Sequence, residues 1–336
     1  MTLTVPVTHK FACLSLKNVF CKYAGGPIQL ANELSVYVRP RSSMDTQWLG
    51  MLCAIDHETL GSLDHEKLTN SNFLILATAP TTTPNHGNDD NERLIERTLH
   101  LFHGILMHGV PHHEDGLLIS GANVDDRVQV QTLQPLPTYY SWGNHLLEKD
   151  PDDLDEKIIK SAGVVAQGLS LVESQSGDFC RFKRGIHAWV RAVQERNYFD
   201  RLHEFVRATE ALLKPKQGET RKQFIHRCKT LAVAGDDQQT GDLLGEIYDL
   251  RSAAEHLNDW GTVLASIPQT EREQHAGQRA FQAEFLAGRS YIRLLSHKDL
   301  REHFRSDDKI QGFWELEDTE RQQRWGNPVD LTALQP

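Results

Sequence analysis

The chain has 336 residues, of which 39% are hydrophobic and 24% are charged, and its formal net charge is −10 at pH 7. This composition is typical of a globular protein, and the length is enough for two domains. No apolar run approaches the ~18 residues of a membrane span, and the first residues lack the pattern of a signal peptide. The acidic charge argues against a general nucleic-acid binder.

The five cysteines favour a reducing compartment. They are odd in number, they are scattered, and none of them forms a CxxC pair: Cys13, Cys21, Cys53, Cys180 and Cys228. A disulfide framework or a thiolate zinc site would need a different spacing. We therefore expect a cytoplasmic protein with no membrane segment.

Residues 1–150 predict a mixed α/β domain with a preference for strands. Short apolar or alternating runs that end in prolines indicate strands at 72–80 and 126–140. Between them, 81–92 has the composition of a loop, and 91–109 has an apolar stripe that predicts a helix ending at Gly109. The acidic stretch 146–157 is the expected domain boundary.

From about residue 151 onward every segment has a helical pattern. The predicted helices are 151–173, 182–197, 198–215, 218–233, 240–261 and 272–304. Amphipathic helices joined by short links indicate a bundle. We thus expect an α+β protein with a mixed α/β domain at 1–150, an α-helical domain at 151–306, and a polar, loosely packed tail at 307–336.

One pair of residues near a predicted helix end is a candidate site. Arg251 and His256 have the spacing R-x4-H, which also occurs at Arg221 and His226. With 22 arginines and 17 histidines, chance alone predicts about one such pair, so the spacing by itself does not select a site. Five helical positions separate two side chains by about 140°, so a shared site needs a loosened last turn or a second copy of the helix.

Three stretches give the region 180–300 a resemblance to an Apea-like HEPN (higher eukaryotes and prokaryotes nucleotide-binding) domain. "RLHEFVRATEALL" (201–213) is similar to an early helix of that family, with Glu210, Leu212 and Leu213 at its end. "ETRKQFIHRCKTLAV" (219–233) resembles the helix that follows. "LLGEIYDLRSAAEH" (243–256) is similar to the motif helix, which typically reads xxYxxRSxxxH. The chain departs from the family pattern at Glu255 and Leu257.

The resemblance implies a homodimeric endoribonuclease that cuts RNA without a metal, in a bacterial defence or toxin setting, under an inhibitory or activating protein partner. The chemistry of the two residues is compatible with that function. The nucleophile is the ribose 2′-OH, His256 would transfer protons near neutral pH, and Arg251 would hold the charge that develops on the phosphate. Ser252, Glu255 and Asn258 are candidate supporting residues.

A local excess of positive charge lies at 181–230, which holds 13 Lys and Arg against 5 Asp and Glu. Such a segment indicates either a solvated helix face or a strip that binds a phosphate backbone. The candidate backbone-binding residues are Arg201, Arg207, Lys214, Lys216, Arg221 and Lys222. No phosphate-loop or dinucleotide fingerprint is present, so no cofactor is expected.

Two other functions compete with the ribonuclease. The first is a metal-dependent hydrolase that uses a histidine cluster in the N-terminal part: His100, His103, His108, His112, His113, Glu114 and Asp115. It lacks the HExxH motif, and we favour a histidine-rich surface turn and no metal. The second is a HEPN-like module that binds RNA or assembles with partners without cutting.

Overall fold

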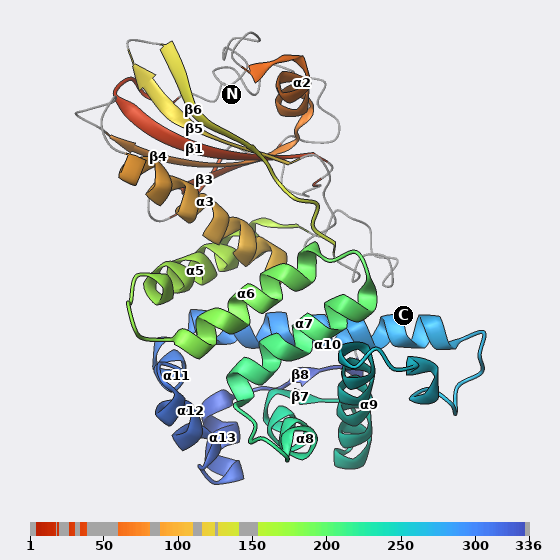
Figure 1. Ribbon diagram of the computed structural model, residues 1–336. Coiled ribbons are helices and arrows are strands. Elements are labelled where there is room, and N and C mark those ends of the chain that lie inside the picture. Colours follow the sequence, from red (N-terminus) through yellow and green to blue (C-terminus); the bar gives the residue numbers. More distant parts are fainter. Residues whose placement is uncertain are drawn as a thin grey trace. The chain divides into compact units, whose positions relative to one another are not determined.

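The protein is described here from a computed structural model, which covers residues 5–17, 19, 27–30, 34–38, 60–80, 88–109, 116–124, 127–140 and 154–332. The fold is α+β, with an antiparallel sheet in the N-terminal part and helices after it (Figure 1). Two compact units divide the chain. The first comprises Met1–Tyr139 and Lys149–Ser170, and the second comprises Tyr140–Glu148 and Leu171–Pro336.

The first unit is built on one six-stranded sheet with the strand order β2-β3-β4-β1-β5-β6. The strands are β1 His9–Leu16, β2 Ile28–Gln29, β3 Leu34–Val38, β4 Phe73–Pro80, β5 Leu117–Val124 and β6 Arg127–Pro135. All neighbours are antiparallel, and β1 pairs with both β4 and β5. The strands predicted at 72–80 and 126–140 are confirmed as β4 and β6.

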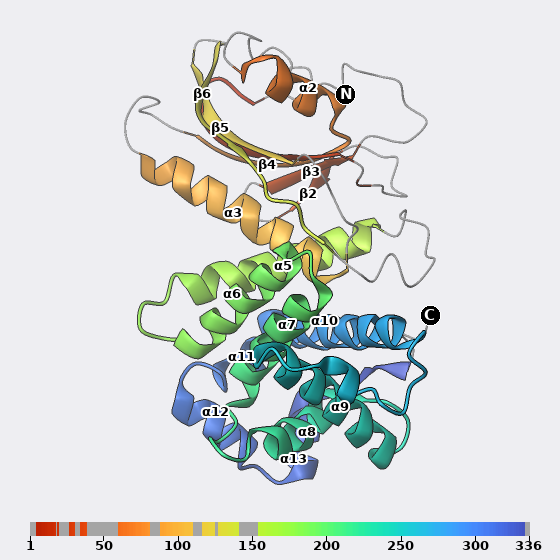
Figure 2. The same ribbon diagram turned by 45° about the vertical axis from the view of Figure 1, so that its right-hand side comes forward.

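Two helices of the first unit cover opposite faces of the sheet, as Figure 2 shows: α2 (Ser62–Asn70) and α3 (Asn88–Met107). Leu68 of α2 joins Phe11 and Ile119 of the sheet in one buried cluster. The helix predicted at 91–109 is confirmed as α3. It ends before Gly109, whose φ of 82° is a conformation that glycine adopts without strain.

The helix α5 (Glu156–Glu173) lies almost wholly in the first unit, so the compact units divide the chain later than the predicted boundary near residue 150. Gly104 of α3 lets the backbones approach, because a Cβ at that position would lie 2.7 Å from the carbonyl oxygen of Ala162. Nε2 of His108 lies 2.9 Å from Oγ of Ser161. The contact between α3 and α5 is therefore both close and polar.

The second unit is mainly helical, with α7 packed against α6, α9 and α10 (Figure 1). Its helices are α6 Cys180–Gln194, α7 Tyr198–Leu213, α8 Thr220–Leu231, α9 Asp237–Glu255, the 3-10 helix η2 Trp260–Thr262, α10 Arg272–Ser296, α11 Lys298–Glu302, α12 Asp307–Trp314 and α13 Asp318–Trp325. The helices predicted at 182–197, 198–215, 218–233 and 240–261 correspond to α6 to α9. The single helix predicted at 272–304 is wrong, because the helix is interrupted at His297, whose backbone is extended.

Two expectations for the second unit are corrected. The region is not entirely helical, since β7 (Ala232–Val233) and β8 (Val329–Asp330) form a short parallel pair. The segment after Ser306 is not loosely packed. Trp314 and Trp325 are buried, and Nε1 of Trp314 donates to the carbonyl oxygen of Leu212 at 2.9 Å. In the part of the chain that the structure describes, no helix has the length and apolarity to cross a membrane.

Candidate functional site

The helix α9 carries the candidate pair, and local signals define both of its ends. At the N-terminus Asp236 accepts from the backbone N–H of Gln239 at 2.8 Å, and the Gln239 side chain reaches back to Asp236, which is a capping box. At the C-terminus the N–H of Asn258 donates to the carbonyl of Ala253 at 2.9 Å. This bond closes a Schellman motif around His256, the C-cap residue. Arg251 thus lies in the last regular turn, and His256 lies at its end.

The residue after His256 has an uncommon conformation. Leu257 adopts a φ of 54°, in the left-handed region where a Schellman motif usually has glycine. Its side chain is 94% exposed, so no packing within the described residues compensates for the backbone strain. The turn that presents His256 is therefore intrinsically strained.

Arg251 is held by two carboxylates. Its side chain is 12% exposed, and its Nη2 donates to Glu210 of α7 at 3.3 Å. Its Nη1 donates to Glu255, one turn further along α9. The guanidinium also lies 5.7 Å from the ring centre of Tyr248. Arg251 is thus fixed in place, and its charge is compensated within the chain.

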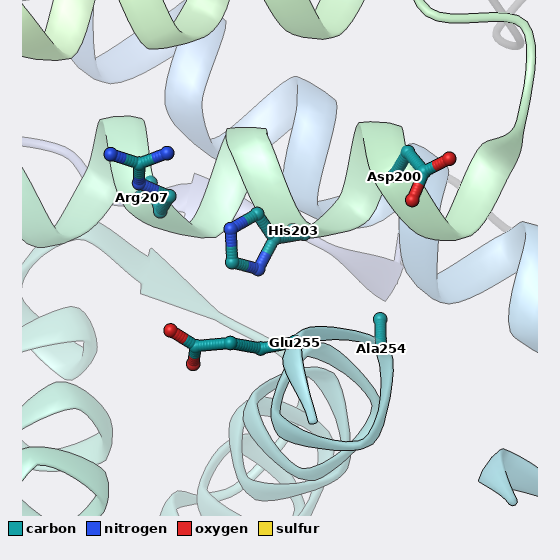
Figure 3. Close-up of a pocket in the computed structure, with 5 residues that line it drawn as sticks. All are labelled: Asp200, His203, Arg207, Ala254 and Glu255. Carbon is teal, nitrogen blue, oxygen red and sulfur yellow. The ribbon is translucent and has the colours of Figure 1, made fainter. Parts of the chain in front are cut away.

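An open pocket of about 510 Å³ lies between α7 and the end of α9. Figure 3 shows Asp200, His203 and Arg207 on α7, with Ala254 and Glu255 on α9 opposite them. The His203 ring points from α7 toward the end of α9. The predicted motif helix therefore borders a polar pocket, although the predicted pair itself does not form the lining.

Three buried polar atoms around Arg251 have no hydrogen-bond partner among the described residues: Nδ1 of His203, Oε1 of Glu210 and Nε of Arg251. Buried polar atoms in proteins are nearly always hydrogen-bonded to protein, water or a ligand, so these three atoms leave room for a further partner. Burial also raises the pKa of Glu210, and the charge of Arg251 opposes that effect. The polar groups around Arg251 retain unused hydrogen-bonding capacity.

The pKa of His203 is lowered from its ordinary value of 6.5. Burial is the largest cause, and the positive charge of Arg251 and, less strongly, of Arg207 acts in the same direction. Glu204 and Glu255 oppose the shift. The ring is therefore neutral at pH 7, and a neutral imidazole can accept a proton.

Of the predicted residues in the pair region, Glu255 lines this pocket, whereas Ser252, His256 and Asn258 do not. Ser252 is half-buried, and Glu255, His256 and Asn258 are exposed. Among the described contacts, the side chain of Arg251 reaches Glu210 and Glu255 rather than His256. The structure thus brings Arg251 together with His203 of α7, a histidine that the sequence motif did not select. The spacing of His203 and Arg207, four positions apart on a strongly patterned helix, was the available signal.

The predicted backbone-binding strip is divided between several places. Arg207 lines the pocket at α9 and pairs with Glu204 at 2.9 Å. Lys214 lies 3.9 Å from Asp307. Lys216 lines neither this pocket nor the pocket along α8 that is described next. Arg201 does not belong to such a strip, because its side chain is 1% exposed and pairs with Glu284 at 2.6 Å inside the bundle.

A second open pocket of about 510 Å³ lies along α8, and it contains the other two predicted lysine and arginine positions. Its lining residues are Gly218, Glu219, Thr220, Arg221, Lys222, Ile225, His226 and Lys229. Arg221 forms a two-point contact with Asp249, at 2.7 and 2.8 Å. Lys229 pairs with Asp237 at 2.7 Å. Acidic residues of α9 thus compensate two of the cations in this pocket.

The histidines of the N-terminal part make ordinary polar contacts where the structure describes them. Nδ1 of His100 lies 2.9 Å from Oγ of Ser170, and His108 contacts Gly104 and Ser161. Within the described ranges, no group of three or more His, Cys, Asp or Glu side chains is arranged to hold a metal ion. His112, His113, Glu114 and Asp115 lie outside those ranges.

Comparison with known proteins gave no match to a family model, to a curated protein or to a solved structure. The assignment of function therefore depends on the chain's own residues.

Proposed function

We propose that this protein is a metal-independent endoribonuclease of the HEPN type, with its site at the C-terminal end of α9. The observation that best supports the proposal is the environment of Arg251. The arginine of the predicted motif is positioned by two carboxylates beside an open polar pocket, with unpartnered polar atoms around it. RNA cleavage by the 2′-OH uses a group that transfers protons and a fixed positive charge near the phosphate, and a histidine and an arginine can supply these.

The proposed reaction uses the residues as follows. The RNA phosphate binds at the open pocket, where Arg251 stabilises the charge that builds up on its oxygens. His256 transfers a proton at the exposed end of the helix. Glu255 is the more exposed of the two carboxylate partners of Arg251, at 38% against 15% for Glu210. The incoming phosphate would displace Glu255, while Glu210 keeps the guanidinium oriented.

A homodimer fits this arrangement. Along a straight helix, five positions place Arg251 and His256 about 140° apart, so one copy of α9 does not direct both side chains to one phosphate. A second copy, related by a two-fold axis, would supply the missing histidine. Light scattering on the purified protein would report the dimer directly.

The alternative is a HEPN-like module that binds RNA without cutting it. It is favoured by one observation: Glu210 and Glu255 together compensate the charge of Arg251 in the isolated chain. RNA binding that persists while cleavage never appears under any condition would identify this alternative.

The deciding experiment is an RNA cleavage assay in excess EDTA with wild type, Arg251→Ala and His256→Ala. We expect each substitution to lower the cleavage rate by about 10²–10³-fold, because each removes a group that acts only in the transition state. Cleavage that requires added metal would favour the hydrolase that uses the N-terminal histidines.

Matched controls separate the site from general effects of substitution. His297 is an exposed C-cap histidine of α10, as His256 is of α9, and Arg196 is an exposed arginine outside the helices. His297→Ala and Arg196→Ala should cleave at the wild-type rate. Arg251→Lys keeps the charge beside Glu210, so a variant that folds normally but cleaves slowly would show that the planar fork matters. Equal rates for all variants would contradict the proposal.

A further inference from the structure

His203 of α7 lines the open pocket between α7 and the end of α9. It sits one helical turn before Arg207 on α7, and four positions separate the two side chains by only about 40° around the helix axis. Both residues line the pocket, and the ring of His203 points toward the end of α9 (Figure 3). In contrast to Arg251 and His256, this pair is directed to one place by a single straight helix.

The ring of His203 is half-buried and incompletely hydrogen-bonded. Its Nδ1 is buried and has no partner among the described residues. A neutral imidazole has one donor and one acceptor nitrogen. The ring therefore lines the pocket with part of its hydrogen-bonding capacity unused, which is compatible with a ligand bound beside it.

The electrostatic environment suits a proton acceptor. The charged groups around the ring are Asp200, Glu204 and Arg207 on its own helix and Arg251 and Glu255 on α9. Burial and the two arginines lower the pKa of the imidazole more than the carboxylates raise it. At pH 7 the ring is therefore unprotonated and ready to accept a proton.

We propose that His203 is a further catalytic residue, the general base of the RNA cleavage. The inference rests on the function proposed above and adds a second histidine from a different helix. In this proposal the ribose that carries the nucleophilic 2′-hydroxyl binds in the pocket at His203, together with the adjacent phosphate. Arg207 and Arg251 are the cations available to that phosphate.

The proton and bond balance of the step is complete. His203 accepts the proton of the 2′-hydroxyl as the 2′ oxygen forms a bond to phosphorus. The bond between phosphorus and the 5′ oxygen breaks, and the 5′ oxygen takes a proton from His256 in its protonated form. The products are a 2′,3′-cyclic phosphate and a 5′-hydroxyl. Exchange with water then returns both histidines to their starting states.

The test uses a substrate that needs a base but no acid. The bond that wild type cuts is first mapped in an RNA of mixed sequence, and sulfur then replaces the 5′ oxygen at that bond. Because a thiolate leaves without a proton, the sulfur substrate should restore cleavage by His256→Ala. His203→Gln should lose about 10²–10⁴-fold with the oxygen substrate and remain equally slow with the sulfur substrate.

The matched control is His303→Gln. His303 is also half-buried, its pKa is also lowered by burial, and it lies beside Arg324, but it lines neither pocket. This variant should cleave both substrates at the wild-type rate. Thermal unfolding of the two variants would verify that each is folded.

The outcomes distinguish the two proposals. If wild type cuts no RNA, the proposed function fails and this inference fails with it. If His203→Gln cuts within about threefold of wild type while His256→Ala is slow, only the role of His203 is overturned. If sulfur restores cleavage by His203→Gln, His203 is not the base.

A wild-type pH–rate profile gives a readout that needs no variant. Its acidic limb should have a midpoint below 6.5, the ordinary pKa of histidine, and a midpoint above that value would contradict the proposal.

Discussion

Arg251 and His256 have different environments although only five positions separate them. The arginine is 12% exposed and has two carboxylate partners, whereas the histidine is exposed at the cap of the helix. Residue type and spacing selected the two residues, but they do not predict the burial or the contacts of either side chain. Glu210 contacts Arg251 from 41 positions away in the chain, and His203 belongs to the same helix as Glu210. Such non-local partners could not be predicted from the R-x4-H pattern.

His100 of α3 gives a pH prediction for the first unit. Burial lowers the pKa of His100 to about 4, from its ordinary value of 6.5. The unfolded chain therefore binds this proton as the pH falls below 6.5, while the folded chain does not, so folding stability is lost between about pH 6.5 and 4. We expect a loss of about 2 kcal/mol from this group between pH 7 and 5, measured by urea unfolding.

The comparison of two variants isolates the contribution of His100. His100→Gln cannot take up the proton, so its stability should fall less between the same two pH values. His297→Gln, at an exposed position of the second unit, should retain the full pH dependence of wild type. The same pH dependence in wild type and His100→Gln would show that His100 is protonated in the folded chain.

At the scale of the element, the helix α9 has a well-capped N-terminus and a strained backbone at its C-terminus. A capping box stabilises the N-terminus, and the C-terminus closes on Leu257 with its φ of 54°. Backbone strain of this kind is found at functional sites, where the surrounding structure maintains it. Here it lies directly beside His256.

Substitution of Leu257 by glycine should stabilise the second unit. Glycine adopts a positive φ without strain, and the leucine side chain is 94% exposed, so no buried contact is lost. We expect a gain of about 0.5–1 kcal/mol in the free energy of unfolding, measured by thermal or urea denaturation. Leu257→Ala retains a Cβ and should give no gain. A glycine variant that is less stable than wild type would indicate that Leu257 packs against a partner.

Elements with a strong apolar period were predictable, and those defined by distant contacts were not. The stripe in α3 predicted its helix because Leu94, Phe102 and Ile105 recur at helical spacing, and the structure buries all three. The segment after Ser306 has few apolar residues and no such stripe. Trp314 is nevertheless buried and donates a hydrogen bond to Leu212, 102 positions earlier in the chain. The pocket has the same origin, since α7 and the end of α9 meet only in the folded chain.

At the scale of the whole molecule, the chain crosses between its two units more than once. Among the described residues, those up to Tyr139 belong to the first unit, Tyr140 belongs to the second, and 154–170 belong to the first again. The helical pattern of α5 resembles that of the later helices, so the sequence favoured a boundary before it. Contacts of Gly104 and His108 with Ala162 and Ser161 join α5 to α3 in the first unit instead.

Two truncated chains would test this division. A chain of residues 1–173 should retain α5 and unfold cooperatively, whereas a chain of residues 1–150 should be less stable and prone to aggregate, because α3 loses its partner helix. Thermal unfolding followed by circular dichroism, together with size-exclusion chromatography, would compare them. Equal stability of the two chains would show that α5 contributes little to the first unit.

The late position of α5 has a consequence for synthesis of the protein on the ribosome. Domains generally fold as units while the chain emerges from its N-terminal end. The sheet and α3 leave the ribosome first, but the polypeptide that completes them arrives only with residues 149–170. The first unit therefore stays incomplete until the ribosome has synthesised α5. During this period the face of α3 that α5 covers is exposed and available to chaperones.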